Sequence, residues 1–124
     1  MGLVYKRLGK GLITPTTVAT SETIVTNATS KDTIITKIHL YNSHSSAVNV
    51  FILVVDDSGG SVGTGAATDV VLGTISVPAT GNVILGSQDC GMALTDTNDT
   101  LQMYASAADK VYAHVWGFTT ADQS

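Results

Sequence analysis

The stretch from Asp32 to Asp56 constrains this chain more than any other, because apolar and polar residues alternate through it in two runs. A period of two is that of a β-strand and excludes a helix. In the first run, one face carries Ile34, Thr36, Ile38 and Leu40. The other face carries Ile35, Lys37, His39 and Tyr41. The second run, Val48 to Val55, becomes apolar on both faces. Residues 42–46 form a short polar turn, so the sequence predicts an antiparallel hairpin.

The composition also favours a β-protein. Only 13% of the residues are charged, whereas 44% are hydrophobic. Threonine and valine suit strands, and a surface poor in charge is one that other protein chains can cover. A length of 124 residues is that of one domain with one core.

Further short extended segments follow one another between turn residues, and no amphipathic helical window interrupts them. They cover residues 12–18, 22–27, 70–77, 82–85, 100–105 and 110–118. The last two are predicted to form a second hairpin. The predicted fold is all-β: an antiparallel β-sandwich, jelly-roll-like, of about eight or nine strands.

The first eleven residues, MGLVYKRLGKG, are predicted to form an extended N-terminal arm, with residues 12–124 as a single β-sandwich domain. So short a segment cannot bury its apolar residues against itself, so it docks on its own domain or on a neighbouring subunit. We favour the neighbour. The predicted partner contacts are Leu3, Val4, Tyr5, Lys6 and Arg7.

The last predicted strand carries an aromatic face. Small apolar residues (Val111, Ala113, Val115) alternate there with Tyr112, His114, Trp116 and Phe118. Three interpretations stay open: the aromatic face belongs to the sandwich core; Tyr112, His114 and Trp116 lie at a subunit interface, where large aromatics are enriched; or Tyr112 and Trp116 form a platform for sugars.

Sites for catalysis, metals and cofactors are not predicted. His39, His44 and His114 have no Glu or Cys at ligand spacing, and the glycine-rich stretch at 59–65 lacks the lysine of a phosphate-binding loop. Two acidic groups could offer oxygen ligands to calcium, although Asp and Asn are also ordinary turn residues. These groups are Asp56, Asp57 and Asp69, and Asp96, Asn98 and Asp99. The single cysteine, Cys90, excludes an intrachain disulfide.

Charge and hydropathy argue against nucleic-acid and membrane partners. The net charge is −4 with a pI near 5.0, whereas a nucleic-acid-binding protein needs a basic stripe. The one basic cluster, formed by Lys6, Arg7 and Lys10, is too small to bind a duplex. No apolar run is long enough to span a membrane, and no signal segment begins the chain, so we expect synthesis in a cytoplasm.

Three segments resemble small β-sandwich virion structural proteins of tailed bacteriophages, of the head decoration or cement type. They are ITKIHLYN at Ile35 to Asn42, VPA at Val77 to Ala79, and DTLQMYASAADKV at Asp99 to Val111. The resemblance extends over about residues 20–118.

The resemblance implies a non-enzymatic capsid decoration protein on the outer surface of the head, made in the host cytoplasm. It would bind the major capsid protein and itself, as a homotrimer, and stabilise the capsid lattice. A neck, tail or fibre-base component of the virion is the alternative within the same particle. A carbohydrate-binding β-sandwich module is the alternative from another class.

Overall fold

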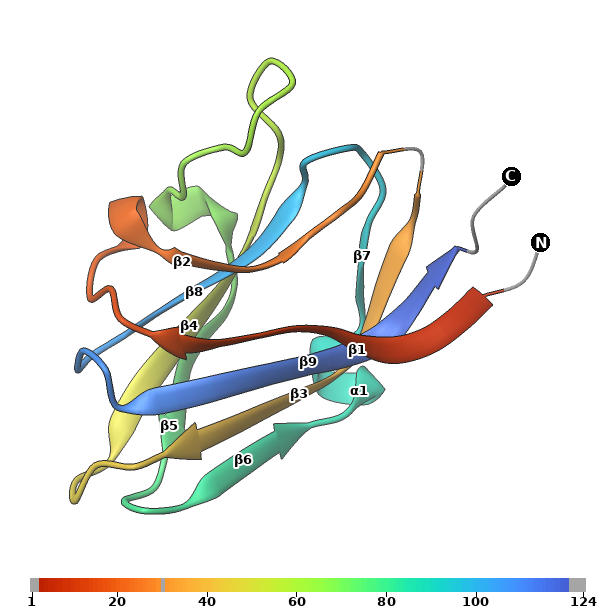
Figure 1. Cartoon of the computed structure of the whole chain (residues 1–124). Helices are drawn as coiled ribbons and strands as arrows, with labels where there is room; N and C mark the ends of the chain where they lie inside the picture. Colours follow the sequence, from red (N-terminus) through yellow and green to blue (C-terminus); the bar gives the residue numbers. More distant parts are fainter. Residues whose placement is uncertain (1–2, 30, 121–124) are drawn as a thin grey trace.

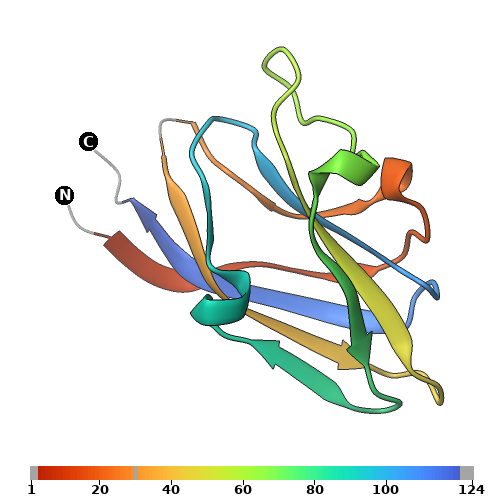
Figure 2. The same ribbon diagram turned by 180° about the vertical axis from the view of Figure 1, so that it is seen from behind.

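A computed structural model describes residues 3–29 and 31–120, which form two antiparallel β-sheets packed face to face (Figures 1 and 2). Sheet A has five strands in the order β1-β9-β3-β6, with β7 also paired to β3; sheet B has the order β2-β8-β4-β5. The predicted all-β sandwich is therefore confirmed, with nine strands. Their bounds are β1 Leu3–Ile13, β2 Glu22–Thr26, β3 Thr33–Asn42, β4 Val48–Val55, β5 Val70–Val77, β6 Asn82–Leu85, β7 Met92–Leu94, β8 Thr100–Ala105 and β9 Val111–Thr120.

The order of the strands is that of a jelly roll. Apart from the short β7, eight strands are divided between two four-stranded sheets, and most connections carry the chain from one sheet to the other. The strands β3 and β4 consequently lie in opposite sheets, and so do β8 and β9. Both predicted hairpins are wrong, because each short polar loop is an arch between sheets.

Buried Asn42 explains how the chain turns into the arch after β3. Its side-chain nitrogen donates to the carbonyls of Ser46, Val77 and Pro78, at 2.9, 3.1 and 3.2 Å. Its Oδ1 accepts the backbone N–H of His44 at 2.8 Å. One side chain therefore hydrogen-bonds three carbonyl groups and one N–H group of the backbone, and it joins the β3–β4 arch to the end of β5.

The core lies between the sheets, and a β-bulge decides which residues of β3 reach it. Ile38 and Leu40 are fully buried, as their shared face predicts, but Ile35 is buried while Ile34 is 37% exposed. The pairing of β3 with β9 shifts between Ile35 and Lys37. The extra residue reverses the alternation, so the predicted faces of Ile34 and Ile35 are exchanged.

Residues 3–11, predicted as an arm, instead form most of β1, which pairs with β9 along its length. Ile13 is fully buried and Leu8 packs against the core. A Cβ added at Gly9 would overlap the carbonyl oxygen of Ile24, so this glycine lets β2 cross β1 closely. Residues 1 and 2 of the predicted arm lie outside the described residues.

Three short helical turns complete the described chain. They are the 3-10 turns η1 (Val18–Thr20) and η2 (Ala67–Asp69) and the helix α1 (Ser87–Cys90). In the part of the chain that the structure describes, no helix is long and apolar enough to cross a membrane.

Candidate functional site

The outward side of sheet A carries the aromatic residues of β9. Val111, Ala113 and Val115 are fully buried against sheet B, whereas Tyr112 is 44% exposed and His114 and Trp116 are half-buried. The interpretation of this aromatic face as core is therefore wrong, because the small residues of β9 fill the space between the sheets. The aromatic side chains face away from the core.

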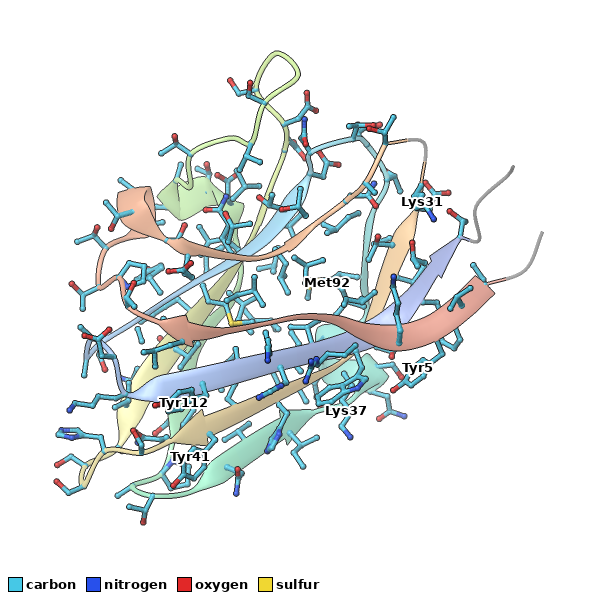
Figure 3. All side chains as sticks on the ribbon, viewed as in Figure 1. Tyr5, Lys31, Lys37, Tyr41, Met92 and Tyr112 are labelled. Carbon is cyan, nitrogen blue, oxygen red and sulfur yellow. The ribbon has the colours of Figure 1, made fainter. Side chains whose placement is uncertain are left out.

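Neighbouring strands extend this aromatic row into a patch. Tyr5 of β1 meets Phe118 edge-on, with ring centroids 5.1 Å apart, and Tyr41 of β3 lies beside Tyr112 at 6.4 Å. Between these ends, His114 stacks on Trp116 at 5.7 Å. The two cross-strand pairs stabilise the sheet, and together with the His114–Trp116 stack along β9 they form a broad surface of rings. Figure 3 labels Tyr5, Lys37, Tyr41 and Tyr112 along this face.

Cations lie among the rings, and carboxylates do not. The ammonium of Lys37 lies 5.3 Å from the ring centroid of Trp116, a cation–π contact. Arg7 and Lys10 occupy the β1 positions opposite Trp116 and His114. The sequences of β1, β3, β6, β7 and β9 contain no Asp or Glu, so the face is positive although the whole chain is acidic.

His114 responds to this environment. Burial lowers the pKa of its imidazole below the ordinary value of 6.5, and the charges of Arg7, His39 and Lys10 lower it further. Its Nδ1 is buried and has no hydrogen-bond partner among the described residues. At neutral pH the ring is therefore uncharged and acts as an aromatic surface.

A depression of about 350 Å³ lies at one end of the face. It is lined by the β1 residues Lys10, Gly11 and Leu12 and the β9 residues Tyr112, Ala113 and His114. Its walls combine an aliphatic side chain, an aromatic ring and one cation. The depression therefore suits an apolar group that is accompanied by negative charge.

Part of the first predicted set of contact residues joins the second set on one surface. Leu3, Val4 and Tyr5 are 53%, 45% and 53% exposed, and Lys6 and Arg7 are exposed beside them. Because β1 pairs with β9, Tyr5 and Arg7 join the face of Tyr112, His114 and Trp116. Lys6 points to the other side of the strand, opposite Gly117.

Sequence reasoning missed four residues of this patch: Lys10, Lys37, His39 and Tyr41. Their alternation in the sequence was the available signal, since Lys37, His39 and Tyr41 share one predicted face of β3. The link to β9 is hidden in the sequence, because the pairing of β3 with β9 joins residues that are 69 to 86 positions apart, from Asn42–Val111 to Thr33–Thr119.

The acidic turn residues form a second cluster, at the end of the sandwich where β4 ends and β8 begins. Carboxylate oxygens of Asp57, Asp96 and Asp99 lie within 4.8 Å of one another. Buried Asp99 accepts the backbone N–H groups of Asp57 and Asp96, at 3.0 and 3.1 Å. Asp69 instead accepts the N–H of Ala66 beside η2. These bonds show that the Asp99 and Asp69 carboxylates stabilise turns of the backbone.

Among the described residues, the histidines and the cysteine do not form a group of three potential metal ligands. His39 and His114 are cross-strand neighbours, with ring centroids 6.4 Å apart, and His39 hydrogen-bonds Asn82 at 3.0 Å. Burial raises the pKa of the Cys90 thiol, which donates to the Leu85 carbonyl. A buried protonated thiol is a poor nucleophile.

A comparison with protein-family models finds no family that matches this chain, and a comparison with curated proteins finds no match either.

Proposed function

We propose that this chain is a non-catalytic virion protein that decorates the outside of a bacteriophage head, binding the major capsid protein and stabilising the lattice as a homotrimer. The main observation that supports this proposal is the character of the outward side of sheet A. It presents exposed rings and cations on rigid strands, without carboxylates on those strands. A surface of this kind is suited to burial against other protein chains.

Two contacts are needed by a decoration protein, one to the shell and one to its own copies. We assign the shell contact to the beginning of β1, where Leu3, Val4 and Tyr5 are exposed at an outer edge of sheet A. An open edge strand with apolar side chains is prone to pair with another chain. Three linked copies would add their weak contacts to the shell.

The fold agrees with this proposal without determining it. Jelly rolls serve in viral shells and also in lectins, so the fold alone leaves both classes open. The sugar platform is the weaker candidate, because the ammonium of Lys37 covers the ring of Trp116. Tyr41 and Tyr112, which are 38% and 44% exposed, are the rings available to a sugar.

The direct test uses DNA-filled heads that lack this protein, mixed with the purified fluorescent chain and then sedimented. We expect wild type to sediment with heads and Tyr5→Asp to bind at least tenfold more weakly. The matched control is Val71→Asp, because Val71 is 51% exposed on β5 of sheet B. Point variants are required, since deletion of β1 would uncover β9.

The same experiment distinguishes the decoration role from the two alternative functions. Binding to tails but not to heads would support the neck, tail or fibre-base alternative. A change of tryptophan fluorescence on adding glycans, with no binding to any part of the particle, would support a carbohydrate-binding module. Equal binding of Tyr5→Asp and wild type would contradict the assignment of the shell contact.

A further inference from the structure

Charge is divided between two separate regions of this molecule. The outward side of sheet A carries three of the six Lys and Arg residues: Arg7 and Lys10 of β1 and Lys37 of β3. The three loops at the end of the sandwich, residues 27–29 with 31–32, 56–63 and 95–99, carry five of the ten Asp and Glu residues and one lysine, Lys31. The acidic residues are Asp32, Asp56, Asp57, Asp96 and Asp99. One copy therefore has a positive face and an acidic end.

Hydrogen bonds hold the acidic loops together. The buried side chain of Asn27 donates to the carbonyls of Lys31 and Asp96, at 2.7 and 3.0 Å, and the amide of Asn98 donates to the Gly60 carbonyl at 2.8 Å. The three loops that carry the acidic residues are therefore joined to one another.

The loop between β4 and β5 projects from this end (Figures 1 and 2). A bridge joins Ser58 to Ser61, and Gly59 and Gly60 both have positive φ, as a tight two-residue turn requires. Val62 follows the turn and is 44% exposed. The loop thus offers an apolar side chain close in sequence to exposed Asp56 and half-buried Asp57.

The depression on sheet A has the complementary character. Leu12 and Tyr112 supply apolar walls for a side chain such as valine, and Lys10 supplies a cation for a carboxylate beside it. Pairing two copies of this face with each other would instead oppose Arg7, Lys10 and Lys37 to their own counterparts, and like charges disfavour such pairing.

We infer that the loop of one copy, residues 56–63, seats Val62 in the depression formed by Lys10, Leu12, Tyr112 and His114 of a second copy. The contact joins two different surfaces, so it is heterologous, and in the proposed homotrimer three such contacts close into a ring. This inference rests on the proposed homotrimer and adds the surfaces that form it.

The test is sedimentation velocity of the full purified chain at about 0.1 M and 1 M salt, where the Debye length falls from about 10 to 3 Å. We expect wild type to sediment near three times the 12.8 kDa mass of one chain at low salt and to dissociate at high salt. Lys10→Glu and Val62→Asp should each weaken assembly at least tenfold. The matched control Lys6→Glu makes the same charge change on the other side of β1 and should assemble normally.

Mixing the variants distinguishes a heterologous contact from a symmetric one. A Lys10→Glu copy keeps an intact loop and a Val62→Asp copy keeps an intact depression, so the mixture should form dimers although each variant alone is monomeric. A monomeric wild type, normal assembly of Lys10→Glu, or a mixture that stays monomeric would overturn the inference. Head binding is measured separately, so a chain that trimerises without binding heads would contradict only the decoration role.

Discussion

Replacing Asn42 by alanine should destabilise the fold far more than its small change in volume suggests. The amide of Asn42 is fully buried and joins four backbone groups of two arches. Its two N–H groups are shared among three carbonyls, so about three effective hydrogen bonds are lost. At about 1 kcal/mol net for each bond, and more where a buried partner stays unsatisfied, the expected loss is about 3–4 kcal/mol.

That loss is a large part of the roughly 5–15 kcal/mol by which a domain is stable, and it corresponds to a Tm about 10–20 °C lower. The assay is equilibrium unfolding in urea followed by tryptophan fluorescence, with thermal unfolding beside it. Asn82→Ala is the matched control, because Asn82 is exposed and forms one side-chain bond, to His39, so its cost should be below about 0.5 kcal/mol. A loss below about 1 kcal/mol for Asn42→Ala would refute the assigned role of Asn42.

Three further predictions follow from single residues. Gly9→Ala should cost about 2 kcal/mol or more, because its Cβ would overlap a backbone carbonyl of β2. Gly73→Ala is the matched control and should be near neutral in urea unfolding, because its Cβ would make only an ordinary contact with the Val70 side chain, at 3.8 Å. The pKa of His114 is lowered in the folded state, so the unfolded state binds more protons just below pH 6.5. The free energy of unfolding therefore falls as the pH drops through that window. His114→Phe should flatten this dependence of stability on pH, and an unchanged dependence would exclude His114 as its cause. Cys90 is 1% exposed, so a thiol reagent should label native protein only at the rate of opening, and immediate labelling would contradict its burial.

Period-two alternation was sufficient to predict strands, and it located most of them correctly. It could not predict which sheet each strand joins, because an arch and a hairpin both use short loops of Asn, Ser and Gly. The difference lies in tertiary contacts such as those of Asn42, whose partners at Val77 and Pro78 are about 35 positions away. The alternation also does not reveal the bulge near Thr36, which exchanges the faces of Ile34 and Ile35.

The candidate site was predicted in two halves. The exposed beginning of β1 and the aromatic residues of β9 were each recognisable from local sequence, as an apolar segment beside basic residues and as an alternating aromatic row. The two groups form one surface only because β1 pairs with β9, and this pairing joins the two ends of the described chain. The positive character of the face also depends on this pairing, since the net charge of −4 conceals it.

Cryo-electron microscopy of purified virus particles, with heads and tails imaged together, tests the central claim most directly. The account predicts density that repeats over the outer head lattice, in copies numbering in the hundreds, with the beginning of β1 against the shell. Density confined to the neck or tail, in low tens of copies, would contradict the decoration role, and particles without this density would contradict a place in the virion.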